Sequence, residues 1–257
     1  MRAGLFLVIG LVATACSPAS QLPDMQPGET GRVVRIIDGD ALALNTGQSV
    51  RLIGIEAPAL RPRGRDPDPY AVEAARALED LALGREVQLH YPGLTRDRYD
   101  RALAHVVTRD GAGPRLWLNI ELVRRGAARV RLYPDTAAQG EVLLAAEATA
   151  RLDRVGLWAK TAYRVPTADE VDVSTRGFML VQGRLDHLES PEGRYRETLA
   201  CQWALSGAAL ALQVRRDAAS VCDLPVGSDV RLRGWVSNQS LDVTHPLHVE
   251  LLNRAVD

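Results

Sequence analysis

Apolar and polar residues alternate in short stretches between residues 31 and 133, and turn residues separate these stretches. Alternation with a period of two is typical of strands that bury one face. The turn "NTG" at 45–47 lies between two such stretches and predicts a hairpin. The pattern predicts a small barrel of five short strands, drawn from the stretches 31–38, 41–45, 48–55, 86–91, 102–109 and 128–133.

Three segments among these strands have helical spacing instead. In residues 69–83, apolar side chains share one helix face at Ala71, Ala74, Leu78 and Leu81. Asp68 and Pro69 suit the first positions of this helix, and Gly84 suits its end. Two further helices are predicted at 116–126 and 141–156. We therefore expect a first domain at 31–164, mainly β with helices packed against a barrel.

The chain changes character after about residue 165, where only strand-like stretches follow. Their spacing is that of a small all-β domain, predicted to span residues 165–257. The predicted strands lie within 177–189, 194–203, 208–216, 229–237 and 241–252.

The first 30 residues have the features of an export segment. Residues 1–15 combine one basic residue with an apolar run that suits a signal peptide but is short for a membrane span. The ending "LVATAC" resembles a bacterial lipobox, which would attach a lipid to Cys16; plain secretion is the alternative. Residues 16–30 are rich in Pro, Ser, Gln and Gly and predict a flexible tether. We expect a bacterial periplasmic lipoprotein without a transmembrane helix in the mature chain.

Charge and cysteine usage refine this prediction. The formal net charge is −1, so the chain as a whole has no electrostatic preference for nucleic acid. Lys160 is the only lysine among 31 basic residues, which indicates a compositional bias toward arginine. In an oxidising compartment, Cys201 and Cys222 are expected to form a disulfide; two buried thiols are the alternative.

Candidate chemistry begins at Asp40 in the stretch "IIDGDALAL". If residues 45–47 form the turn, the numbers of two residues that face each other across the hairpin add up to about 92. Asp40 then lies close to Arg51, Leu52 and Ile53. Taken alone, a carboxylate beside an arginine at a strand end indicates a simple ion pair.

The order of motifs along residues 31–160 adds a second line of argument. "VVRIIDGDALAL", "VRLIGIEAPAL", "TRDRYDRALAHV" and "LNIELVRRGAARV" follow one another as in the thermonuclease family, also called staphylococcal nuclease-like domains, which this region resembles. The resemblance implies a five-stranded OB-type barrel with three helices. It also implies calcium-dependent hydrolysis of DNA and RNA. The all-β region resembles an OB-like extension found in some bacterial relatives, from which no functional residue is carried over.

The resemblance assigns roles to individual residues. Asp40 and Glu56 become carboxylate ligands of calcium, and Ala57 contributes a backbone carbonyl. Arg51 and Arg101 become the phosphate-binding arginines, which would stabilise negative charge on the phosphoryl oxygens. With Glu56, they form the predicted catalytic set.

One departure from the family pattern bears directly on catalysis. Ala59 stands where the family has the glutamate that acts as general base, a contribution of about 10²–10⁴-fold in rate. Glu56, Asp66 or Asp68 could compensate. Three functions stay open: a weak calcium-dependent nuclease acting on single-stranded DNA or RNA, a non-catalytic nucleic-acid or phosphate-binding module, and an envelope protein that makes protein contacts.

Aromatic residues of the all-β region give a weaker signal. Trp203, Trp235, Tyr195 and Arg231 could line a binding face, although core packing is the better interpretation at alternating strand positions. The five histidines are scattered and have no metal-ligand spacing.

Overall fold

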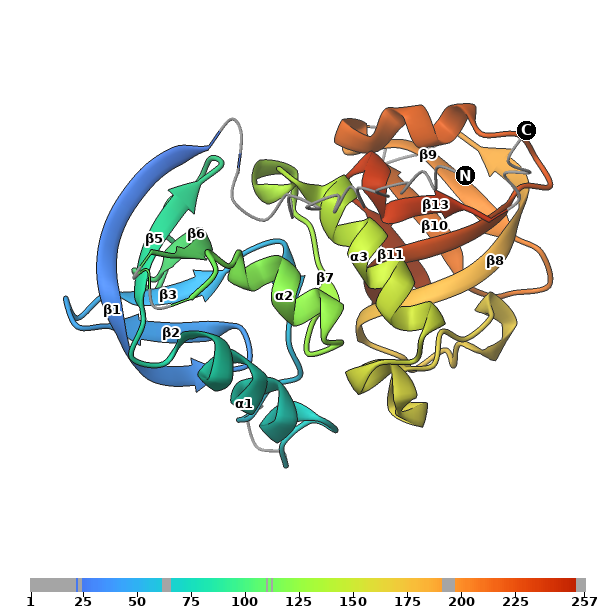
Figure 1. Ribbon diagram of the computed structural model, residues 1–257. Helices are drawn as coiled ribbons and strands as arrows, with labels where there is room; N and C mark the ends of the chain where they lie inside the picture. Colours follow the sequence, from blue (N-terminus) through green and yellow to red (C-terminus); the bar gives the residue numbers. More distant parts are fainter. Residues whose placement is uncertain are drawn as a thin grey trace, which may run out of the picture.

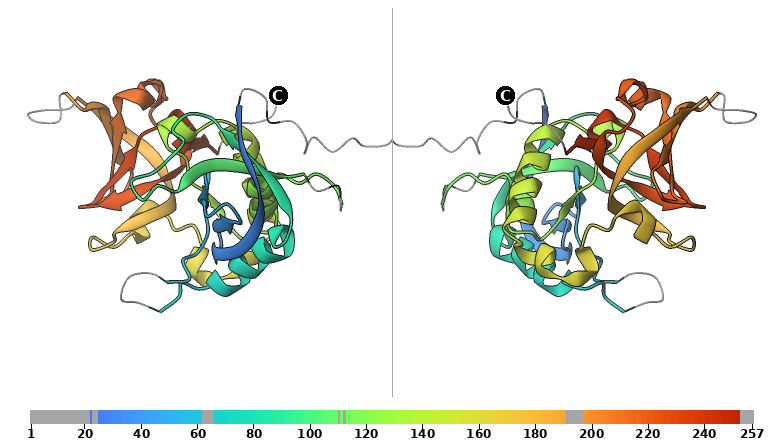
Figure 2. Two further views of the ribbon diagram at one scale, coloured as in Figure 1. Left: turned by 90° about the vertical axis from the view of Figure 1, so that its left-hand side faces the viewer. Right: turned by 90° about the vertical axis from the view of Figure 1, so that its right-hand side faces the viewer.

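Two β-barrels account for most of the chain, and helix α3 lies between them (Figures 1 and 2). The computed structural model describes residues 22, 25–61, 66–109, 111, 113–190 and 197–252. The predicted signal peptide, Cys16 and Tyr195 lie outside the described residues.

The first barrel closes in the strand order β1-β2-β3-β6-β5. Strands β3 and β6 run parallel, and the other neighbours are antiparallel. This order confirms the five-stranded OB-type barrel expected from the sequence. The strands are β1 (Gln26–Asp38), β2 (Ala41–Leu44), β3 (Ser49–Leu52), β5 (Glu86–Tyr91) and β6 (Ala102–Thr108).

Strand β1 begins five residues before the predicted start at Gly31, so the tether prediction is wrong for residues 26–30. This part of β1 pairs with β5, where Gln26 faces Tyr91. The Glu29 carboxylate accepts hydrogen bonds from the Tyr91 hydroxyl and from Arg96. Composition alone misled the prediction, because the partners of this segment lie about 60 residues further along the chain.

Three α-helices cover the first barrel, as predicted: α1 (Ala71–Ala82), α2 (Leu118–Arg124) and α3 (Gly140–Leu152). Every residue of the predicted apolar face of α1 is buried. The predicted cap is wrong, because the helix starts after Tyr70, and the Asp68 carboxylate accepts the backbone N–H of Ala59 instead. Within the described residues, no helix is long and apolar enough to cross a membrane.

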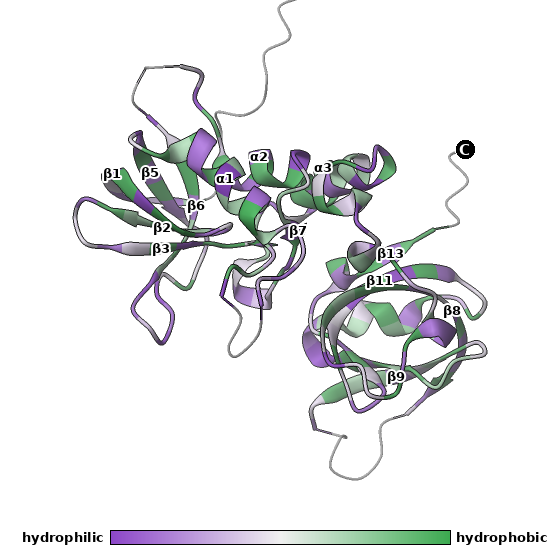
Figure 3. Cartoon of the chain, turned by 90° about the horizontal axis from the view of Figure 1, so that it is seen from below, coloured by the Kyte–Doolittle hydropathy of each residue, from purple (hydrophilic) through white to green (hydrophobic). Residues whose placement is uncertain are grey.

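When the five strands of each barrel are counted along the chain, both barrels have the order first, second, third, fifth, fourth. Strands β8, β9, β10, β12 and β11 form a closed ring, because β11 pairs with both β8 and β12, and β13 extends one edge of β11 (Figure 3). Strands β10 and β12 are the parallel pair. The strands are β8 (Gly177–Glu189), β9 (Leu199–Leu205), β10 (Ala211–Arg215), β11 (Asp229–Ser237), β12 (Ser240–Val243) and β13 (Val249–Leu251).

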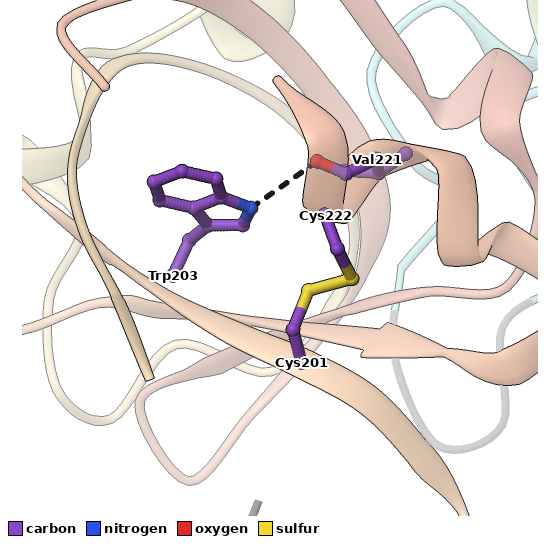
Figure 4. The surroundings of a disulfide bond; sticks show 4 residues. All are labelled: Cys201, Trp203, Val221 and Cys222. Carbon is purple, nitrogen blue, oxygen red and sulfur yellow. Dashed lines mark hydrogen bonds between the residues drawn. A yellow bond between two sulfur atoms is a disulfide. The ribbon is translucent and has the colours of Figure 1, made fainter. Parts of the chain in front are cut away.

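A disulfide joins Cys201 of β9 to Cys222 in the 3-10 segment Arg216–Asp223 (Figure 4). The indole of Trp203 is buried beside this bond and donates a hydrogen bond to the Val221 carbonyl at 3.2 Å. Trp203 is therefore part of the core. The cysteines are 21 residues apart, and closing such a loop contributes about 3 kcal/mol to stability.

The barrels meet at a two-residue strand, β7 (Arg129–Val130), which pairs with β4 (Ile55–Glu56) in a separate two-stranded sheet. A carboxylate oxygen of Glu147, on α3, accepts the Val130 N–H at 2.7 Å. The Val130 carbonyl accepts a hydrogen bond from Arg233 of β11 at 3.0 Å. Arg233 and Glu147 also form an ion pair at 2.7 Å, with side-chain exposures of 3% and 0%. This buried network fixes the second barrel against the first.

Replacing Arg233 with methionine should destabilise the protein strongly. The substitution keeps an apolar stem but removes a charge that pairs with buried Glu147, a change that costs about 3–5 kcal/mol. Chemical denaturation measures the loss. The exposed Arg184, on the neighbouring strand, is the matched control, and Arg184→Met should cost no more than about 1 kcal/mol. Equal losses in the two variants would contradict this role for Arg233.

Candidate functional site

The hairpin of β2 and β3 brings Asp40 and Arg51 together. Its register pairs Ala41 with Arg51 and Leu42 with Val50, so facing residues sum to 92 as predicted. Arg51 Nη1 lies 2.7 Å from Asp40 Oδ1. The side chain of Asp40 is 1% exposed and that of Arg51 is 25% exposed. The arginine therefore separates the carboxylate from solvent.

Burial dominates the acid–base behaviour of Asp40. It raises the pKa of this carboxyl to about 6, although the nearby Arg51 and the Ala57 N–H favour the charged form. The Ala57 N–H donates to Asp40 Oδ2 at 2.8 Å. Oδ1 is buried and, despite its short distance to Arg51, makes no hydrogen bond of good geometry. The carboxylate is thus incompletely compensated.

The neighbouring segment is held by further carboxylates. Asp38 Oδ1 accepts the backbone N–H groups of Gly39 and Leu60. The Ala59 N–H donates to Asp68 Oδ2 at 3.0 Å. Asp68 therefore lies beside the position where the family has its general base, but its carboxylate is used to anchor the loop.

Glu56 faces β7 and is held by two arginines. Register places Glu56 opposite Arg129, whose Nη2 lies 3.3 Å from Glu56 Oε2. Arg131 Nη1 donates to the other carboxylate oxygen, Oε1. Both oxygens of Glu56 are therefore already paired with guanidinium groups. Sequence reasoning missed this pair, although the alternation in "RVRLY" places Arg129 and Arg131 on the same side of an extended segment.

Arg101 is held by an acid four residues earlier. Its Nε and Nη2 both lie 2.7 Å from Asp97 Oδ2, and its backbone N–H donates to Asp97 Oδ1. Burial opposes ionisation of Asp97, but these hydrogen bonds lower its pKa below the usual value. Asp100 has φ 60°, a left-handed backbone conformation that favours glycine.

One cavity of about 500 Å³ collects most of these groups. Three of the predicted site residues, Arg51, Arg101 and Glu56, line it, and Arg131 lines it as well. Asp40 lies behind Arg51 and is not part of the lining. The other lining residues are Leu52, Ile53, Gly54, Ile55, Leu94, Asp97, Leu103, Tyr133, Asp135 and Thr136.

The predicted metal ligands do not fit a calcium ion in this arrangement. Calcium takes six to eight oxygen ligands, several of them carboxylate oxygens. Asp40 is paired with Arg51 and with a backbone N–H, and both oxygens of Glu56 are paired with arginines. Across the described residues, no three His, Cys, Asp or Glu side chains are grouped to hold a metal.

Comparison with known proteins identifies the first barrel. A family model described as staphylococcal nuclease homologue matches residues 49–160. The thermonuclease of Staphylococcus intermedius is 29% identical over 136 residues, which is 52% of this chain and 78% of that protein. The thermonuclease of Staphylococcus hyicus is 28% identical over 139 residues, 51% of this chain and 76% of that protein. Residues 49–160 therefore match the staphylococcal nuclease family.

A fungal protein also matches this nuclease-like domain. The probable endonuclease LCL3 of Phaeosphaeria nodorum is 33% identical over 143 residues, which covers 52% of this chain but only 46% of the fungal protein. The family match ends at residue 160, before the second barrel begins at Gly177. The nuclease-like domain therefore occurs here with a partner domain that the family model does not describe.

The raised pKa of Asp40 predicts a specific pH dependence. The folded state holds a proton on this carboxyl up to about pH 6, whereas the unfolded chain releases it near 3.8. Relative to Asp40→Asn, the wild-type protein should therefore lose up to about 3 kcal/mol of unfolding free energy as the pH rises from 4 to 7. Denaturation of both proteins across this range measures the difference. A constant difference would contradict the burial argument.

Proposed function

We propose that this pocket binds the phosphodiester backbone of single-stranded DNA or RNA without a bound calcium ion. Hydrolysis in it is slow or absent, because both oxygens of Glu56 are paired with arginines and Ala59 replaces the general-base glutamate of the family. The observation that carries this proposal is the convergence of Arg51, Arg101 and Arg131 on one cavity. The family relationship with thermonucleases supports nucleic acid as the ligand.

The ion pairs of the three arginines are compatible with phosphate binding. A guanidinium group has five N–H donors in a planar fork, so pairing with one carboxylate leaves donors for a phosphate. Arg51 is held by Asp40, Arg101 by Asp97 and Arg131 by Glu56. These carboxylates also fix the guanidinium groups in place, which reduces the entropy lost on binding.

Calcium-dependent hydrolysis is the second candidate, and the nuclease family favours it. In that case Asp40, Glu56 and the carbonyl of Ala57 would be the metal ligands. Arg51, Arg101 and Glu56 would be the catalytic set. The arginine pairs of Glu56 argue against this arrangement, because the carboxylate would have to leave both before binding a cation.

Export is part of the same proposal. The apolar residues 3–15 and Cys16 suit a signal peptide and a lipid anchor, and thus a periplasmic lipoprotein. The disulfide between Cys201 and Cys222 supports an oxidising compartment. We also propose that the domain boundary lies between residues 164 and 165, and that the nuclease-like domain and the second barrel are exported together.

Removing a pocket arginine should weaken binding of a fluorescent oligothymidylate. Loss of one charge-assisted hydrogen bond to phosphate costs about 1.5–3 kcal/mol, so Arg101→Ala should raise Kd about 10- to 100-fold. It should also reduce the slope of log Kd against log salt concentration by about one. Anisotropy titrations measure both quantities.

Two further variants complete this binding test. Arg51→Lys keeps a charge beside buried Asp40 but should still weaken binding, because lysine cannot reproduce the fork. Arg184→Ala, on the second barrel, is the control and should leave Kd unchanged. Wild-type affinity in both pocket variants would contradict the proposal.

A cleavage assay separates the two candidate functions. We expect neither the wild-type protein nor Ala59→Glu to show calcium-dependent cleavage of single-stranded DNA or RNA, because Glu56 stays paired with its arginines. Reactions with calcium and with a chelator are compared for both proteins. If Ala59→Glu with calcium cleaves at least about 100-fold faster than wild type, only the base was missing, and the hydrolase candidate replaces the binding one.

A further inference from the structure

We propose that Trp235 of the second barrel extends the pocket by stacking on a base of the bound single strand. This inference rests on the proposed function of the pocket. It adds a residue from a domain that the family model does not cover, and it requires the ligand to have unpaired bases.

Trp235 is exposed where its strand is otherwise mostly buried. Its side chain is 50% exposed, whereas Val230, Leu232 and Val236 of the same strand are at most 1% exposed. It takes no part in the hydrophobic core of the second barrel. A single exposed apolar residue is ordinary on a protein surface, so what distinguishes Trp235 is the Arg131 guanidinium beside its ring.

Arg131 links Trp235 directly to the pocket. The Arg131 guanidinium carbon lies 5.5 Å from the centre of the Trp235 ring and 5.2 Å from that of Tyr133. The same guanidinium pairs with Glu56 inside the cavity. Phe178, which faces Trp235 across β8 and β11, lies 5.3 Å from Arg131 on the same measure. A continuous aromatic and cationic strip therefore runs from the pocket onto the second barrel.

This strip matches the repeating chemistry of a single-stranded nucleic acid. Such ligands present alternating phosphates and bases, and their binding sites combine arginines with aromatic side chains. Stacking on the face of a base requires that base to be unpaired, so a duplex cannot use Trp235 in this way. Tyr133, which is about half exposed, also lines the cavity and places a second exposed aromatic ring beside Arg131.

The network around β7 makes this arrangement rigid. Arg233, two residues before Trp235, is bonded to the Val130 carbonyl, and Arg131 follows Val130 directly. The indole and the guanidinium are therefore held in one frame although they belong to different domains. A base-stacking residue that is fixed before binding loses little entropy when the ligand arrives.

Intrinsic fluorescence can report on Trp235 directly. Trp117, Trp158 and Trp203 are at most 8% exposed, so a change in emission on ligand binding comes mainly from Trp235. We expect an oligothymidylate to quench the emission of the wild-type protein and to protect it from acrylamide. Trp235→Phe should retain most of the affinity. Trp235→Ala should raise Kd about 5- to 150-fold, the range expected for one stacked base.

An abasic oligonucleotide of equal length isolates stacking from other effects. Wild-type protein and Trp235→Ala should bind it with equal affinity, because it has phosphates but no bases. Leu188→Ala removes another half-exposed apolar side chain of the second barrel and serves as the control, with unchanged Kd for both ligands. Thermal unfolding checks that each variant is folded.

The outcomes distinguish this inference from the proposed function. If Trp235→Ala binds the oligothymidylate as tightly as wild type while Arg101→Ala binds it weakly, Trp235 stacking is wrong and the phosphate pocket stands. If Trp235→Ala weakens binding to the abasic ligand equally, the residue does not stack on a base. If the wild-type protein binds no oligonucleotide, both proposals are wrong.

Discussion

The placement of β7 depends on the buried contacts that Glu147 and Arg233 make with the Val130 backbone. One side chain accepts the Val130 N–H and the other donates to its carbonyl, so this residue is satisfied by helix α3 and by the second barrel together. A two-residue strand gains little stability from its own pairing. Without both partners, Val130 would have a buried polar group without a hydrogen bond, and such groups cost about 1–3 kcal/mol each.

Fixing β7 also fixes the charges on either side of Val130. Arg129 and Arg131 both reach Glu56, and the aromatic residues of the second barrel flank their guanidinium groups. The second barrel therefore acts on the nuclease-like pocket through this short strand. Its influence is structural, because it determines which groups stand beside Glu56.

Local patterns allowed much of this fold to be predicted from the sequence. The turn at 45–47 determines the hairpin register, and the register brings Asp40 to Arg51. Contacts between distant segments could not be predicted in this way. Glu56 and Arg131 are 75 residues apart in the sequence. Strand alternation predicts on which face of its strand Arg131 lies, but it does not predict which residue Arg131 contacts. Composition likewise hid the start of β1, since pairing with β5 orders a segment that resembles a linker.

The arginine pairs of Glu56 and the alanine at position 59 are physically consistent with each other. A divalent cation and a guanidinium group both neutralise a carboxylate, but only the cation also binds and polarises water or a phosphoryl oxygen as a Lewis acid. A general base is useful where such a nucleophile must lose a proton. Where arginines neutralise Glu56, a glutamate three residues further along would add a negative charge to the same segment without a water to activate. Alanine at position 59 adds no such charge, which suits the anionic ligand that we propose.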